Sequence, residues 1–127
     1  MKTPIDDFVR RYAGGDTVRL HMPGHKGKNF TGAERFDITE ICGADELYAA
    51  DGIIAESEKN ASLLFGSGKT LYSTEGSSQC IRAMVYLTTL EKRSGARPYI
   101  LAGRNAHRTF IYALALCDID VRWLIPE

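Results

Sequence analysis

The sequence has no excess of charge of either sign. Its 127 residues contain 16 Lys and Arg and 16 Asp and Glu, so the net charge is zero with neutral histidines. Without a positive surplus the chain has no overall attraction for a polyanion, which argues against a nucleic-acid partner. The 44% hydrophobic and 25% charged residues are typical of a folded globular domain.

Long apolar runs are also missing. No stretch approaches the ~20 apolar residues that span a bilayer. The first residues, MKTPIDDFVRRYAGGD, carry two aspartates where a signal peptide needs an apolar core. We therefore expect a cytoplasmic protein without a membrane partner.

Cysteine is scarce. Cys42, Cys80 and Cys117 are an odd number and form no CxxC pair. This pattern predicts reduced thiols and argues against a disulfide framework or a zinc knuckle.

The apolar pattern predicts an α/β fold. Helical segments alternate with short apolar strands in the second half of the chain, in the order β-α-β-α-β, which is typical of a parallel sheet with right-handed crossovers. We expect Leu64 and Phe65 to face inward on the second helix, and the third helix to be covered on two sides. The expected elements are a helix at 4–13 capped by Thr3, a loop at 20–31, a helix at 51–66, a strand at 70–73, a helix at 78–93, a strand at 99–102, a turn at 103–105, a helix at 106–117 and a strand at 121–125.

This topology predicts where a ligand binds. In open parallel sheets, ligands bind beyond the carboxyl ends of the strands. The loops 73–78 and 103–107 both follow such ends, so we expect them to open at the same edge of the sheet.

The first of these loops, TEGSS at 74–78, offers a glycine and two hydroxyls where a strand leads into a helix. Gly76 permits close approach of the backbone, and the unpaired N–H groups of the helix start favour an anion such as phosphate. Ser77 or Ser78 acting only as a helix cap is the alternative interpretation.

The second loop, RNAHRT at 104–109, places an imidazole at the start of the next helix. His107 can stack on a flat ring or hydrogen-bond a ligand. A local capping or surface role is the alternative.

Two further motifs are rejected as ligand sites. His21 and His25 lie four residues apart, but Pro23 and Gly24 between them break a helix, so no metal site is predicted. The segment GSGKT at 66–70 lacks the first glycine of a nucleotide-binding P-loop, because Leu63 stands at that position.

Taken together, four segments resemble one enzyme family. They are LHMPGHKG at 20–27, FDITEICGADELYAADGIIAESEKNASLLFG at 36–66, TEGSS and RNAHRT. In this order they resemble the amino-terminal part of the pyridoxal-phosphate-dependent Orn/Lys/Arg decarboxylases. The resemblance implies a fold type I aminotransferase-like large domain, with a partial parallel sheet in a three-layer αβα arrangement.

The resemblance also implies roles for individual residues. Gly76, Ser77 and Ser78 would hold the phosphate of pyridoxal 5'-phosphate, and His107 would stack on its pyridine ring. A loop near the active site, at the boundary of a homodimer, would contain His21, Pro23, Gly24, His25 and Lys26.

The chain departs from the family pattern in two ways. Glu75 replaces the asparagine common before the glycine, and a carboxylate beside a phosphate is unfavourable unless it points away or is paired. The family's Schiff-base lysine and the aspartate that pairs with the pyridine nitrogen lie further downstream, without counterparts at matching positions here. We therefore assign no catalytic residue in these 127 residues and expect them to be inactive by themselves.

The resemblance thus implies the front portion of a decarboxylase of arginine, lysine or ornithine that feeds polyamine synthesis. Its partners would be a small-molecule amino-acid substrate and further copies of the chain, in a homodimer or higher homo-oligomer. Residues 1–66 would carry the first helix, the glycine-rich loop and the second helix, and residues 67–127 the first part of the cofactor-binding domain. A non-catalytic phosphate-binding or interaction module, or another fold type I enzyme, is the alternative.

Overall fold

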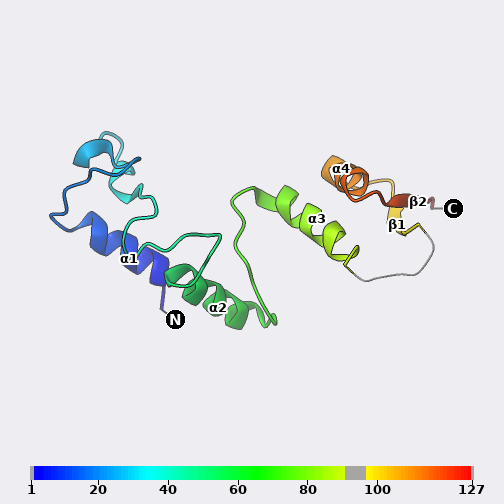
Figure 1. The fold of residues 1–127 in the computed structure, drawn as a ribbon, viewed down its shortest axis with the longest axis horizontal. Coiled ribbons are helices and arrows are strands. Elements are labelled where there is room, and N and C mark those ends of the chain that lie inside the picture. The colour runs from blue at the N-terminus through cyan, green and yellow to red at the C-terminus, as the bar shows by residue number, and fades with distance from the viewer. Residues whose placement is uncertain (1, 91–96, 127) are drawn as a thin grey trace. The chain divides into compact units, whose positions relative to one another are not determined.

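The computed structural model describes residues 2–90 and 97–126. The chain divides into two compact units, Met1–Tyr72 and Ser73–Glu127, which are described separately (Figure 1). Within the described residues, no helix combines the length and the apolar character that crossing a bilayer requires. The elements are α1 (Pro4–Ala13), η1 (His25–Gly27), η2 (Glu34–Phe36), α2 (Ile53–Phe65), α3 (Gly76–Leu87), β1 (Tyr99–Gly103), α4 (Arg108–Leu116) and β2 (Asp120–Leu124).

Helix α1 begins and ends as its sequence predicts, but its cap differs. Pro4 opens the helix and Gly14 follows its last residue. Thr3 makes no capping bond with its side chain. Instead the Thr3 hydroxyl donates to the Asp7 carboxylate at 3.0 Å, so the aspartate of the first turn reaches back to the residue before the helix.

Helix α2 ends at Phe65, and the left-handed conformation of the next residue, Gly66 (φ 63°), is typical of a helix C-terminus. Helix α1 packs against α2 and η2. The expectation that Leu64 and Phe65 face inward is wrong, because these side chains are 65% and 75% exposed. They lie in the last turn of α2, where no described element covers them.

The segment 70–73 is not a strand, contrary to the sequence-based expectation. A strand needs a neighbouring strand to accept its backbone N–H groups. Here the N–H of Tyr72 donates to the buried carboxylate of Glu58 in α2, at 2.7 Å. A side chain therefore takes the place of the expected strand partner.

The second unit is built around one parallel crossover. Strands β1 and β2 pair in parallel, with Tyr99 opposite Asp120 and Gly103 opposite Leu124, and α4 connects them. The strand and turn predictions at 99–105 and 121–125 are confirmed to within about one residue. This two-stranded sheet is compatible with an α/β fold, whereas the third strand expected at 70–73 is absent from the described residues.

The core of this unit lies between α3, α4 and the chain entering β2. Helix α3 packs against α4, and α4 contacts β2. The buried apolar residues of this core are Val85, Ala113, Leu114 and Ile119.

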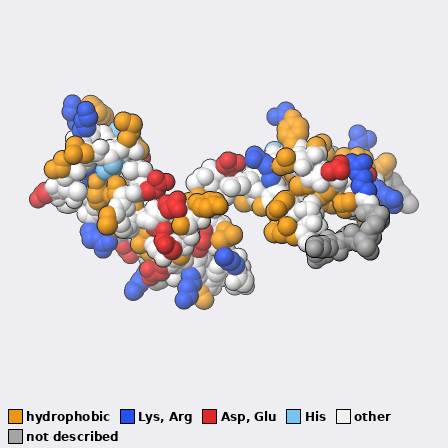
Figure 2. Space-filling view, in the orientation of Figure 1, with side chains coloured by type: hydrophobic (Ala, Val, Ile, Leu, Met, Phe, Trp, Pro, Cys, Tyr) orange, Lys and Arg blue, Asp and Glu red, His pale blue; other side chains and the backbone are white. Residues whose placement is uncertain are grey.

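Helix α3 is covered on one side only, so the expectation of two covered sides is wrong. Val85 is 4% exposed, whereas Met84 and Leu87 are each 60% exposed. The helix ends at Leu87, and the predicted continuation to 93 falls in part outside the described residues. Figure 2 shows hydrophobic side chains at the surface of both units.

Candidate functional site

Helix α3 begins without a capping side chain. Glu75 precedes the helix and makes no side-chain capping bond, and Gly76 opens it with a φ of 63°. Ser77 and Ser78 lie inside the first turn, so the alternative that either of them caps α3 is wrong. The first N–H groups of a helix have no carbonyl partners within it and favour an anion.

The carboxylate of Glu75 is paired. It accepts a hydrogen bond from the Arg82 guanidinium at 3.3 Å. Both side chains are about half exposed, so solvent and salt weaken the pair. The guanidinium nevertheless offsets the negative charge that the sequence places beside the start of α3.

The side chain of Ser73 hydrogen-bonds the loop that leads into α3 to the helix. Its hydroxyl lies 2.6 Å from Oε1 of Gln79 and 3.3 Å from the carbonyl oxygen of Gly76. The turn before the helix is thus held to the first two turns of the helix itself.

His107 caps helix α4. Its Nδ1 accepts the backbone N–H of Thr109 at 3.2 Å. Because Nδ1 is the acceptor, the neutral ring carries its hydrogen on Nε2. The capping role considered from the sequence is therefore confirmed, and it fixes one edge of an exposed imidazole.

A side-chain contact joins the starts of α3 and α4. The hydroxyl oxygens of Ser78 and Thr109 lie 3.2 Å apart, and either can donate. Both residues are half-buried. The two loops that the topology predicts at one sheet edge are thus linked through the first turns of the helices that follow them.

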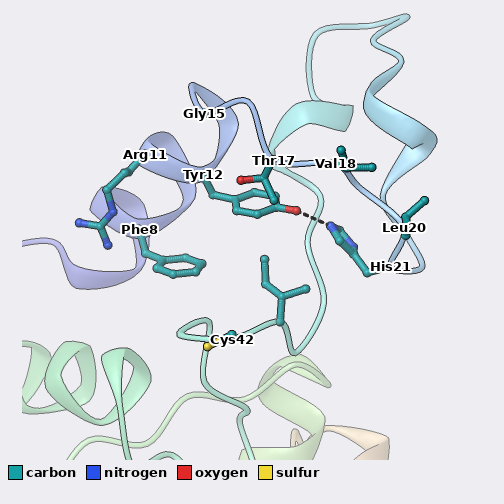
Figure 3. Close-up of a pocket in the computed structure, with 10 residues that line it drawn as sticks. Phe8, Arg11, Tyr12, Gly15, Thr17, Val18, Leu20, His21 and Cys42 are labelled. Atoms are coloured by element: carbon teal, nitrogen blue, oxygen red, sulfur yellow. Dashed lines mark hydrogen bonds between the residues drawn. The ribbon is translucent and has the colours of Figure 1, made fainter.

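The histidine-containing loop lies in the other unit, beside α1. The hydroxyl of Tyr12 lies 2.8 Å from Nε2 of His21, as Figure 3 shows. Arg19 is buried, lies 5.0 Å from the centre of the Tyr12 ring and donates to the carbonyl of Arg35 at 2.9 Å. These contacts hold the start of the loop against the helix.

An open pocket of about 610 Å³ lies at this contact. Phe8 and Tyr12 from α1, His21 from the loop, and Ile41 and Cys42 contribute to its wall (Figure 3). Most of this wall is apolar, so the pocket suits an apolar group better than a phosphate.

The close approach of His21 leaves no room for a side chain at Gly24. A Cβ there would lie 2.6 Å from the carbonyl oxygen of His21 and 3.1 Å from Nδ1 of its ring. That Nδ1 is buried and has no hydrogen-bond partner within the part of the chain that the structure describes. The peptide bond between Met22 and Pro23 is cis.

The two histidines of this loop have different partners. Nε2 of His25 lies 2.9 Å from the Asp37 carboxylate, whereas His21 contacts Tyr12. Lys26 is exposed. Across residues 2–90 and 97–126, no group of three or more His, Cys, Asp or Glu side chains is placed to hold a metal ion.

Comparison with known proteins identifies the family. The profile of the Orn/Lys/Arg decarboxylase major domain matches residues 3–127. The chain belongs to this family. No solved structure shows significant similarity to it.

The relatives support the family assignment. Arginine decarboxylases of Bacillus subtilis (strain 168) and Halalkalibacterium halodurans are each 28% identical over 136 residues, covering 99% of the chain. The uncharacterized protein YaaO of B. subtilis is 27% identical and covers the whole chain. The chain spans 27% of the length of each of these three relatives.

The predicted site residues fall into two groups. Gly76, Ser77, Ser78 and His107 belong to the second unit, and the loop 21–26 belongs to the first. Residues at these groups that were not predicted from the sequence include Thr109, which contacts Ser78, Tyr12 and Asp37, which contact His21 and His25, and Arg82, which pairs with the neighbouring Glu75. Only Arg82 has a sequence signal, since it lies seven residues after the unexpected Glu75 and can reach back along the helix.

Proposed function

We propose that the chain is the amino-terminal portion of a pyridoxal-phosphate-dependent decarboxylase of arginine, lysine or ornithine. The match of the family profile to residues 3–127 carries this proposal. The arginine decarboxylases among the relatives support a basic amino acid as the substrate. We further propose that the complete protein is a cytoplasmic homodimer that supplies polyamine synthesis. The loop 21–26 would lie near its active site.

The start of α3 suits the phosphate of the cofactor. The first-turn N–H groups and the hydroxyls of Ser77 and Ser78 are donors, which a phosphate dianion needs. A Cβ built on Gly76 meets no atom within 4 Å, so the backbone here is open to an approaching group. The Glu75–Arg82 pair limits repulsion between the phosphate and the carboxylate.

His107 is the proposed support for the cofactor ring. Its imidazole is exposed and held along the Nδ1 edge by the N–H of Thr109, so a ring face remains available for stacking. When bound, pyridoxal phosphate supplies an electron sink for the pair released as the carboxylate leaves the substrate. The residues described here bind and orient that cofactor.

The test uses the complete native polypeptide that contains these residues. It is incubated with pyridoxal phosphate and with arginine, lysine or ornithine in turn, and released carbon dioxide is measured. We expect release from one of the three, and a Ser77→Ala/Ser78→Ala variant is expected to bind the cofactor more weakly. Ser62→Ala, which removes a hydroxyl bonded within α2 at 2.9 Å, is the matched control.

Two results would contradict the proposal. One is a native polypeptide that binds no pyridoxal phosphate, and the other is one that binds it but releases no carbon dioxide from any of the three amino acids. Binding of inorganic phosphate without the cofactor would favour the non-catalytic phosphate-binding module.

A further inference from the structure

Thr109 contacts both halves of the proposed cofactor site. Its hydroxyl lies 3.2 Å from the hydroxyl of Ser78, and its backbone N–H donates to Nδ1 of His107 at 3.2 Å. One residue in the first turn of α4 therefore contacts the proposed phosphate-binding segment and the proposed ring-stacking side chain.

From this contact we infer that Thr109 is a positioning residue, which orients the Ser78 hydroxyl toward the cofactor phosphate and holds the His107 ring for stacking. The inference rests on the proposed function. It adds a residue outside the segment that would touch the phosphate, acting through Ser78 and His107.

The hydroxyls of Ser78 and Thr109 have a limited capacity for hydrogen bonds. Each has one O–H donor and two acceptor positions. Without an anion, either Ser78 or Thr109 can donate to the other. A phosphate dianion accepts hydrogen bonds and takes the single O–H of Ser78, so Thr109 must then donate to the Ser78 oxygen.

Phosphate binding thus selects one direction of the hydrogen bond between Thr109 and Ser78. In the resulting chain Thr109 donates to Ser78 and Ser78 donates to the phosphate, and each bond polarises the next. A side chain without a hydroxyl at position 109 would leave the Ser78 hydroxyl free to rotate.

The backbone contact of Thr109 has a separate role. It fixes the Nδ1 edge of His107, and valine, alanine or serine at 109 keeps it because the donor is the backbone N–H. A substitution of Thr109 therefore tests the hydroxyl contact alone.

The experiment compares variants of the complete native polypeptide. Thr109→Val removes the hydroxyl at nearly constant volume, and Thr109→Ser keeps it. Thr88→Val is the matched control, because the Thr88 hydroxyl donates to the carbonyl of Val85 at 2.7 Å, at the opposite end of α3. The readouts are the Kd for pyridoxal phosphate by equilibrium dialysis and the visible circular dichroism of the bound cofactor.

Thr109→Val is expected to raise the Kd about 3- to 10-fold, the effect of one hydrogen bond, and to change the circular dichroism band. Thr109→Ser and Thr88→Val are expected to match the wild type. In a Ser78→Ala background, Thr109→Val should have little further effect, because Thr109 acts on the phosphate through Ser78.

Several outcomes would overturn the inference. Thr109→Val with the Kd and circular dichroism of the wild type would do so, as would equal losses in Thr109→Val and Thr109→Ser, or full additivity with Ser78→Ala. If Thr109→Val fails to fold, Thr109→Ala removes the same hydroxyl without adding bulk. A wild-type polypeptide that binds no cofactor would instead overturn the proposed function, and this inference with it.

Discussion

The carboxylate of Asp45 accepts the backbone N–H of Ile54, nine residues later, at 2.9 Å. It also accepts the N–H groups of Glu46, Asp51 and Gly52, at 2.8 to 3.3 Å. Because Ile54 is the second residue of α2, Asp45 caps this helix from a distance in sequence. One side chain thus closes the segment 45–54 into a loop.

Asp45→Asn tests this cap. Asp45 has a φ of 65°, a conformation that asparagine adopts readily, so the substitution removes charge without adding backbone strain. We expect a lower Tm, because an amide nitrogen replaces one accepting oxygen. The measurement is thermal unfolding followed by circular dichroism. Asp16→Asn, at an exposed aspartate of the same unit, is the control, and equal Tm values for the two variants would contradict the prediction.

Acid should weaken the first unit through Asp45 and Glu34. Burial raises the pKa of Asp45, but the four backbone N–H groups outweigh it and lower this pKa from 3.8 to about 2. The pKa of Glu34 is lowered from 4.5 to about 2, first by its own backbone N–H and then, against a smaller effect of burial, by bonds from Thr31 and Gly32.

These lowered pKa values determine whether stability rises or falls with pH. The folded state binds the two protons more weakly than the unfolded state does, so both groups stabilise the fold above about pH 4.5. That contribution decreases as the pH falls toward about 2. Urea denaturation at several pH values should show a decreasing free energy of unfolding across this range, with a smaller decrease for Asp45→Asn. If the free energy of unfolding of Asp45→Asn decreases as much as that of the wild type, Asp45 does not contribute to the loss of stability in acid.

Tyr12→Phe should loosen the histidine-containing loop. The variant keeps the ring that stacks on Phe8 at 6.4 Å between centroids, but it loses the hydroxyl bonded to Nε2 of His21. We expect the free energy of unfolding to decrease by about 1 kcal/mol in urea denaturation. Tyr48→Phe is the control, since Tyr48 is 98% exposed, and a decrease of the same size there would count against the prediction.

Arg82→Gln should weaken binding of pyridoxal phosphate. Without the guanidinium, the Glu75 carboxylate is unpaired beside the start of α3 and repels the phosphate. We expect a Kd about 2- to 5-fold higher, with a larger effect at low salt. Adding Glu75→Gln removes the repelling charge and should restore the Kd. A double variant that binds as weakly as Arg82→Gln would show that Arg82 acts in another way.

The sequence predicted well the helices whose ends carry a proline or a glycine. Helix α1 lies between Pro4, whose φ is fixed by its ring, and Gly14, and α2 is followed by Gly66 in the left-handed conformation. The segment 70–73 was predicted wrongly because a β-like composition does not reveal whether a partner strand exists. Glu58, fourteen residues before Tyr72, supplies the acceptor instead.

The contacts of the candidate site were less accessible to sequence analysis. His107 contacts a residue two positions away, so its capping role was among the interpretations considered. The Ser78–Thr109 contact spans 31 residues and depends on how α3 packs against α4. Tyr12 and His21 meet only because the chain turns back after α1, which no local pattern encodes.

The left-handed backbone conformation of Gly76, rather than a lack of space, restricts which residue fits at this position. A Cβ on Gly76 would meet no atom within 4 Å, yet its φ of 63° is one that an L-residue rarely adopts. A D-alanine introduced there by chemical synthesis would have the mirror-image preference and would suit this backbone. Position 76 therefore has room for the methyl group of an L-residue, but it has a backbone conformation that such a residue disfavours.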